Sequence, residues 1–285
     1  ADSRKEMPSQ MPDDSWIETT DPFNHISIWD DDSRLRTSGI FTYRILHRTE
    51  KMAAIVSVNE KVEDLTIPAV LDGYKIFCIS IPWGADTYDS PEMPGKLNDS
   101  LKSLTIQDGI QEIGDIAFSG CKKLTTLKLP RNLVRIGYGA FSGCTSLRKV
   151  KIQDSKYITG TEIDEKAFSD CVIDQFSIEG YTSIGDNPFL GSRIREVVFP
   201  KITGIRSHGI NIDRAQVEKM WADPYMQSLR FESMGWDYKR GVLQKLIVNG
   251  KKTKIQGWNR ANIFGSLYTV PKAACIKWAK KYKLT

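Results

Sequence analysis

Hydrophobic and polar residues follow a pattern that recurs along the middle of the chain. Residues 101–121 align with residues 124–144 without a gap, and the leucine and isoleucine positions coincide. The pentapeptide Ala117–Cys121 recurs unchanged as Ala140–Cys144. This pattern predicts an array of similar units over residues 100–200. The apolar positions of the later, less regular copies are Leu147, Val150, Ile152, Ile163, Ala167 and Phe168, then Ile173, Phe176, Ile178, Ile184 and Phe189, and then Ile194, Val197 and Phe199.

Each unit contains a Leu-x-x-Leu-x-Leu phrase, which predicts a short strand with inward-facing apolar residues. One unit cannot bury these residues alone, but stacked units enclose a continuous core and align their strands as a parallel sheet on one face. We expect the Phe of each Ala-Phe pair to fill the space on the return side of the coil. The sequence therefore predicts an α/β leucine-rich-repeat solenoid with short helical or irregular returns, an N-terminal strand cap and a C-terminal strand-helix cap.

The run from Ile113 to Pro130 carries a more specific pattern, Ile-Gly-x-x-Ala-Phe-Ser-Gly-Cys-x-x-Leu-x-x-Leu-x-Leu-Pro. It resembles the BspA-type (Treponema pallidum-type) leucine-rich repeat of bacterial surface and secreted proteins. Residues 41–79 resemble the opening unit of such proteins, so the resemblance covers about residues 40–200. It implies an exported or cell-surface protein that binds host or microbial macromolecules in adhesion or colonisation.

The chain divides into an acidic flexible leader at 1–35 and a solenoid at 36–285. The solenoid begins with an N-terminal cap and first unit at 36–80, whose strands at 41–58 are joined around residues 47–50. Regular repeats follow at 100–200. We expect a helical insertion at 201–226, because Asp213 and Gln216 have the spacing of a capping box that opens a short helix to Trp221. Degenerate repeats and a basic C-terminal cap occupy 227–285, with strand phrases at 229–231, 246–248 and 268–270 and a helix at 272–283.

Charge is unevenly distributed, although the 40 basic and 35 acidic residues leave a net charge of only +5. This excess is small for a nucleic-acid binder, and no apolar stretch approaches the roughly 18 residues of a membrane helix. The chain starts with Ala, and we expect a processed, extracellular product. From Tyr238 onward there is no acidic residue. That end is either a solvated basic cap or a face for anionic carbohydrate, formed by Lys251, Lys252, Lys254, Trp258 and Lys277.

The sequence contains no recognisable catalytic or metal-binding motif. Cys121, Cys144 and Cys171 recur at the same position in successive units, which indicates a ladder of buried thiols and not a metal site. Neither a Gly-x-Ser-x-Gly elbow nor an HExxH helix occurs, and we expect no cofactor and no metal. A carboxylate pair for glycoside hydrolysis would be created by the fold, so a polymer-degrading hydrolase stays a less favoured alternative.

Residues between the inward positions of each strand should form outward columns across the sheet. These columns are polar and partly basic, which favours non-catalytic recognition of a protein or glycan by a monomer. Aromatic residues in the long loop after residue 80 and in the expected insertion are candidate anchors. They could equally cover gaps in the core. The candidate binding residues are Thr105, Lys128, Lys149, Lys151 and Ser177 on the strands, and Trp83, Tyr88, Trp221 and Tyr225 among the aromatics.

Overall fold

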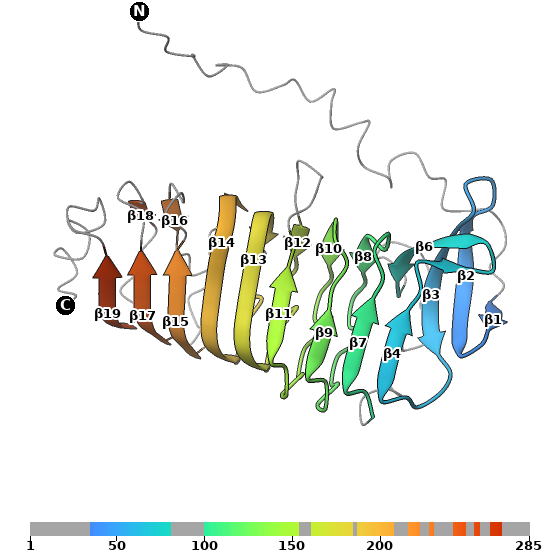
Figure 1. The fold of residues 1–285 in the computed structure, drawn as a ribbon, viewed down its shortest axis with the longest axis horizontal. Helices are drawn as coiled ribbons and strands as arrows, with labels where there is room; N and C mark the ends of the chain where they lie inside the picture. Colours follow the sequence, from blue (N-terminus) through green and yellow to red (C-terminus); the bar gives the residue numbers. More distant parts are fainter. Residues whose placement is uncertain are drawn as a thin grey trace, which may run out of the picture.

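The computed structural model describes residues 35–80, 100–153, 161–184, 187–207, 216–222, 228–230, 242–248, 254–256 and 263–269. These residues form a β-solenoid whose strands stack side by side along one long axis (Figure 1). No residue in these ranges is helical. The predicted solenoid of parallel strands is therefore present, while the described part of the chain is built from strands and turns alone.

One wall of the solenoid, here called the sheet wall, contains one strand from each coil. Its neighbouring strands are parallel and in register, so equivalent residues of successive coils lie next to each other. In order across the wall, the strands are β4 (Asp64–Ile67), β7 (Ser103–Ile106), β9 (Thr126–Lys128), β11 (Lys149–Ile152), β13 (Val172–Ile184), β14 (Arg193–Ser207), β15 (Gln216–Ala222), β17 (Val242–Val248) and β19 (Ile263–Thr269).

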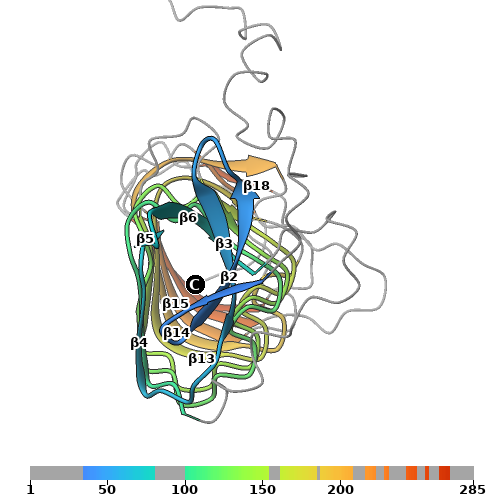
Figure 2. The same cartoon turned by 90° about the vertical axis from the view of Figure 1, so that its right-hand side faces the viewer.

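A second wall lies at an angle to the first, as the separate positions of β4 and β6 in Figure 2 show. Here β6, β8, β10 and β12 are parallel neighbours, and β12 pairs with the later half of β13. The short strands of this wall are β5 (Val70–Leu71), β6 (Tyr74–Ile79), β8 (Glu112–Ile113), β10 (Arg135–Ile136) and β12 (Thr161–Ile163).

The N-terminal end contains the predicted hairpin. Strand β2 (Phe41–His47) runs antiparallel to β3 (Met52–Val58), and the short β1 (Arg36–Ser38) pairs with the outer side of β2. Strand β3 then runs parallel to β6 and so joins the hairpin to the first coil. A small separate apolar cluster lies on one side of this junction, and it consists of Leu46, Ala54, Val56, Phe77 and Cys78.

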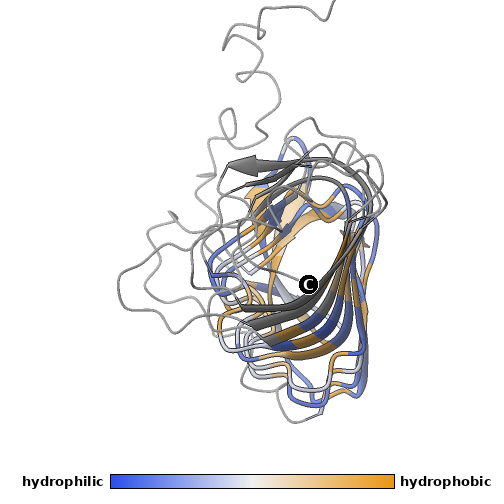
Figure 3. Ribbon diagram, turned by 90° about the vertical axis from the view of Figure 1, so that its left-hand side faces the viewer, coloured by the Kyte–Doolittle hydropathy of each residue, from blue (hydrophilic) through white to orange (hydrophobic). Residues whose placement is uncertain are grey.

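The core is a set of apolar ladders that repeat from coil to coil. The rings of Phe118 and Phe141 stack with centroids 5.5 Å apart, and those of Phe141 and Phe168 stack at 5.3 Å. Phe176 from the sheet wall meets Phe168 edge-on at 5.0 Å. All four rings are completely buried, and the Ala-Phe motif predicted this for Phe118, Phe141 and Phe168. In Figure 3, hydrophobic and hydrophilic residues alternate in strips along the walls.

The expected helix from Gln216 to Trp221 is wrong, because these residues form strand β15. The expectation rested on the capping-box spacing of Asp213 and Gln216. In the strand, Val217 and Met220 are three residues apart. They pair in register with Ile194 and Val197, and both are buried. The spacing therefore belongs to the Leu-x-x-Leu phrase of a further coil. Residues 216–222 continue the repeat and are not an inserted helix.

The later strand phrases have different positions in the fold. Residues 246–248 lie in β17, and Tyr268 and Thr269 lie in β19, both on the sheet wall. Leu229 instead lies in β16 (Ser228–Arg230), which pairs with β18 (Lys254–Gln256) in a separate two-stranded sheet. The expected C-terminal helix at 272–283 and the acidic leader lie outside the described residues.

Candidate functional site

Two outward columns cross the sheet wall, as the alternation of the strands requires. In the first column Thr66 neighbours Thr105, which neighbours Lys128. Lys149 lies opposite Thr126, and this register places Lys151 beside Lys128. The second column runs through Asp64, Ser103, Thr126, Lys149, Gln175 and Glu196. The structure thus brings together the strand residues that the sequence singled out.

The exposure of these residues separates them into two groups. Lys128, Lys149 and Lys151 are exposed, and Thr105 is partly exposed. Ser177 is 7 % exposed, so its predicted contact role is not supported. Its neighbours in register are Lys151 and Val198, whose longer side chains leave the small hydroxymethyl group little access to solvent.

The charge on the sheet wall is mostly uncompensated in its middle. Lys151 forms an ion pair with Glu179 on the adjacent strand, with Nζ 2.9 Å from Oε1. Neither Lys128 nor Lys149 forms an ion pair with another residue that the structure describes. Lys128 also interacts electrostatically with Asp108. These two exposed ammonium groups on adjacent strands make this part of the wall attractive to anionic groups.

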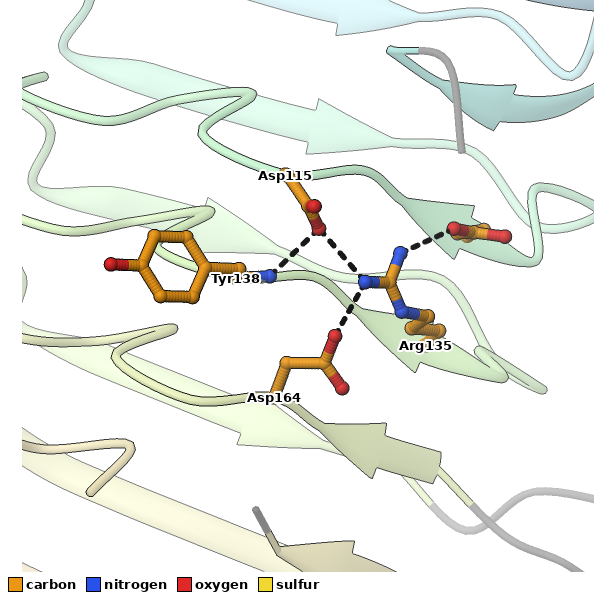
Figure 4. A network of polar contacts seen from close by, with 5 residues as sticks. Asp115, Arg135, Tyr138 and Asp164 are labelled. Atoms are coloured by element: carbon orange, nitrogen blue, oxygen red, sulfur yellow. Dashed lines mark hydrogen bonds and ion pairs between the residues drawn. The ribbon is translucent and has the colours of Figure 1, made fainter. Parts of the chain in front are cut away.

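A second candidate lies on the second wall, where one guanidinium contacts three carboxylates (Figure 4). We call this group the Arg135 network. Arg135 donates to Glu112 Oε1 at 2.7 Å, to Asp115 Oδ1 at 2.8 Å, and to Asp164 Oδ2. Asp115 Oδ1 also accepts the backbone N–H of Tyr138 at 2.9 Å. Strand β10 thus places Arg135 between carboxylates from the preceding and the following coil.

Burial controls the protonation of these carboxyl groups. Desolvation raises the pKa of Glu112, although the hydrogen bond and the charge of Arg135 oppose it. Desolvation likewise raises the pKa of Asp164, again opposed by Arg135. Glu162, the register neighbour of Arg135, is exposed, and partial desolvation together with the charge of Asp164 raises its pKa as well. Several carboxyl groups with raised pKa values are what a hydrolase would need.

The contacts nevertheless favour a structural role for the Arg135 network. Each of the three contacting carboxylates already accepts a hydrogen bond from the guanidinium, and Glu112 is only 2 % exposed. Glu112, Arg135 and Asp164 come from three successive coils, so the network ties these coils together. No group of residues in the described ranges has the arrangement of a metal site.

The repeated cysteines form the buried ladder that the sequence predicted. Cys121, Cys144 and Cys171 are free thiols and completely or almost completely buried. Burial raises the pKa of Cys121 and of Cys171 to about 12, and it raises that of Cys144 as well. The thiol of Cys171 donates to the carbonyl of Phe141 at 3.1 Å. These groups are structural and offer no activated nucleophile.

Of the four aromatic candidates, only Trp221 lies among the described residues. Trp83, Tyr88 and Tyr225 lie outside the described residues. Trp221 was expected in an insertion, but it lies in strand β15, in register between Val198 and Ile247. Of the alternative carbohydrate face, Lys254 begins strand β18, and the other members, Lys251, Lys252, Trp258 and Lys277, lie outside the described residues.

The sequence pattern predicts the first outward column as far as Val198, and the structure extends it beyond that residue. The register continues from Ser177 to Val198, then to Trp221, Ile247 and Tyr268. Val198 and Trp221 are separated by the same number of residues as Ala117 and Ala140. This equal spacing is the signal that could have placed Trp221 on the sheet wall.

Comparison with known proteins identifies the repeat. Residues 97–211 match the family described as BspA type leucine-rich repeat region, in six copies. A comparison with curated proteins gives no match. Among the residues that the structure describes, none form a helix that could span a membrane.

Several solved structures of leucine-rich repeat proteins are similar to this chain. The Treponema pallidum leucine-rich repeat protein is 16 % identical, with a TM-score of 0.43, over 87 % of this chain and 96 % of that one. A leucine-rich repeat protein from Bacteroides capillosus ATCC 29799 is 25 % identical, with a TM-score of 0.33, over 41 % and 81 %. A leucine-rich cell surface protein from Faecalibacterium prausnitzii A2-165 is 13 % identical, with a TM-score of 0.25, over 81 % and 97 %.

Proposed function

Because residues 97–211 are a BspA-type leucine-rich repeat region, we propose that the protein is a non-catalytic recognition protein. It binds host or microbial macromolecules through the outward face of its sheet wall. The observation that carries this proposal is the pair of in-register columns with exposed Lys128, Lys149 and Lys151. A flat array of hydrogen-bonding and basic side chains suits extended contact with a large partner, because many weak contacts add up.

The structural reason for the proposal is that these side chains contribute little to the fold. Their backbone atoms hold the parallel sheet, while Leu127 and Val150 between them point into the core and are buried. The outward positions are therefore free to vary without loss of packing. Lysine at three neighbouring outward positions concentrates positive charge where a partner can reach it.

Charge reversal tests the proposal. We expect the triple variant Lys128→Glu, Lys149→Glu and Lys151→Glu to lose binding to those proteins and glycans that the unaltered chain captures from an array of host matrix proteins and glycans. The matched control is Lys122→Glu with Lys123→Glu, since both lysines are exposed and lie away from the strands. Unchanged capture by the triple variant would show that the sheet wall is not the binding surface.

A second candidate function is binding of anionic carbohydrate at the basic C-terminal end, where no acidic residue follows Tyr238. This contact should weaken steeply as salt rises, whereas an apolar protein contact should not. Reversal of Lys251, Lys252 and Lys254 to Glu should then abolish glycan capture. The triple variant of the sheet wall serves as the control, and retained capture by the C-terminal variant rules the second candidate out.

The absence of catalysis and the location are parts of the same proposal. The Arg135 network is the place to look for hydrolysis, so the variant Glu112→Gln should leave the products of incubation with surface polysaccharides unchanged. If the unaltered chain degrades a polysaccharide and Glu112→Gln abolishes that activity, catalysis would replace recognition as the function.

Extracellular or cell-surface location predicts that protease added to intact cells removes the protein, and protection from that protease would contradict it.

A further inference from the structure

The first outward column of the sheet wall changes its chemistry along the solenoid. In the earlier coils it consists of Thr66, Thr105, Lys128, Lys151 and Ser177, which are all polar. From β14 onward the same column continues as Val198, Trp221, Ile247 and Tyr268. Strands β14, β15, β17 and β19 lie side by side (Figure 1). We call these four residues the apolar strip.

The strip occupies outward register positions. Met220 and Leu246 are completely buried in the core, and the next residues along β15 and β17 are Trp221 and Ile247. Because neighbouring residues of a strand face opposite sides, these positions belong to the outer face. Val198 and Ile247 are partly exposed. The core does not require apolar residues at these four positions, since Thr and Lys hold them in earlier coils.

A basic column accompanies the strip. The second outward column continues from Glu196 to Lys219, Lys245 and Ser266. Glu196 accepts a hydrogen bond from Gln175 Nε2 at 2.9 Å. The strip therefore has two lysine positions beside it, in the same strands as Trp221 and Ile247. An anionic occupant with apolar faces complements this pairing of columns.

The repeat distance identifies the shape of the occupant. The strip offers one residue per strand along a straight line, at intervals of about 4.8 Å. One pyranose ring of a linear glycan has about this length, so successive rings match successive strands. An extended polypeptide presents side chains on one face only about every 6.7 Å, and it falls out of step with the strands. Aromatic residues also present flat apolar faces with a polar edge, which suit the faces of sugar rings.

We propose that the apolar strip, with Lys219 and Lys245, binds a linear anionic glycan that lies across strands β14, β15, β17 and β19. The sugar rings lie over the positions of Trp221 and Tyr268, and their sulfate or carboxylate groups meet the two lysines. This inference rests on the proposed recognition function and names its ligand class and its location. It differs from the basic C-terminal face, because Lys251, Lys252 and Lys254 take no part.

The test measures binding of the full-length chain to three probes by titration calorimetry. These probes are heparin, desulfated and N-acetylated heparin, and poly-L-glutamate. We expect heparin to bind best. Two double variants should each weaken heparin binding about tenfold or more, as expected for residues at the centre of an interface. The aromatic variant is Trp221→Ser with Tyr268→Ser, and the lysine variant is Lys219→Glu with Lys245→Glu. Trp221→Phe and Lys219→Arg should largely retain binding. Lys122→Glu with Lys123→Glu is the control, and thermal unfolding checks that each variant folds.

Four results would overturn the inference. The first is no heparin binding by the unaltered chain. The second is heparin binding that the lysine variant loses and the aromatic variant keeps, which shows attraction to any polyanion. The third is binding of poly-L-glutamate as tight as that of heparin. The fourth is loss of heparin binding only in the variant with Lys251, Lys252 and Lys254 reversed.

The proposed function has its own readout in the same set of proteins. Suppose that the Lys128, Lys149 and Lys151 triple variant loses a partner from the array, that the strip variants still bind this partner, and that the unaltered chain does not bind heparin. In that case only the glycan inference fails. If neither the triple variant nor the strip variants change the capture of any partner, the sheet wall is not a recognition surface and both fail.

Discussion

On the sheet wall the ammonium groups of Lys128 and Lys149 extend into solvent, whereas on the second wall the guanidinium of Arg135 lies among three carboxylates of neighbouring coils. Both walls carry charge at equivalent positions of successive coils. The difference is that the charges of the Arg135 network are paired with one another, whereas Lys128 and Lys149 form no ion pair with another residue that the structure describes. The comparison separates charges that stabilise the solenoid from charges that are available to a ligand.

The largest effect should come from the ladder that both walls enclose. Phe141→Ala removes a ring stacked between Phe118 and Phe168 and leaves a cavity. We expect a loss of about 3–5 kcal/mol in the free energy of unfolding, measured by urea denaturation. Val150→Ala, at another fully buried position with a smaller side chain, should lose less. An equal loss in both variants would mean that the stacked rings stabilise the fold no more than other buried residues do.

The next largest effect should come from the Arg135 network. Arg135→Met leaves Glu112 buried without its partner, and we expect a loss of about 3 kcal/mol in the free energy of unfolding at neutral pH. The control is Arg131→Met, which breaks an exposed ion pair with Asp108 and should cost less than about 1 kcal/mol. If the two variants were equally stable, the network would not tie the coils together.

A smaller effect should appear in the dependence of stability on pH. The folded state raises the pKa of Glu112, so it binds this proton more readily than the unfolded state does, and stability contributed by Glu112 rises as pH falls. Asp108 has a lowered pKa because of hydrogen bonds from Arg131, so its contribution is lost as pH falls through its folded pKa. Urea midpoints across a pH series should therefore shift in opposite directions for Glu112→Gln and Asp108→Asn. Parallel shifts would contradict these assignments.

The smallest effect on stability should come from the sheet wall. The triple reversal of Lys128, Lys149 and Lys151 changes outward side chains only, and we expect it to change the free energy of unfolding by about 0.5 kcal/mol or less at each position. The free energy is measured under the same urea conditions as for Arg135→Met. A loss as large as that of Arg135→Met would show that these lysines stabilise the fold, and the contrast between the walls would disappear.

The parts of the fold that repeat could be predicted from the sequence, because burial repeats the same residue types. The Ala-Phe pairs, the cysteine ladder and the outward column through Thr105 and Lys128 all followed from one alignment of the chain with itself. The helix expected from the capping-box spacing of Asp213 and Gln216 was wrong, because Val217 and Met220 fit a leucine-rich coil as well as a helix. Only the pairing with Ile194 and Val197 decides between them.

The Arg135 network could not be predicted from residue types alone. Glu112, Arg135 and Glu162 occupy one register position of successive coils, and their alternating charge was visible in the sequence. That alternation, however, does not reveal that Asp115 and Asp164 also reach the guanidinium. Their approach depends on the turn after each short strand, where a Cβ on Gly137 would meet the backbone nitrogen of Asp115 at 2.8 Å. The absence of that atom leaves room for the turn to pack closely.

Because the strands of the sheet wall are parallel and in register, the solenoid can be lengthened by whole coils. The coil of residues 101–123 and the next coil of residues 124–146 place their strands directly beside each other with matching positions. A duplicated copy of residues 124–146 would therefore add one strand and about 4.8 Å to the wall and would preserve the order of positions on both sides. Gene duplication or protein engineering could in this way set the length of the binding face one coil at a time.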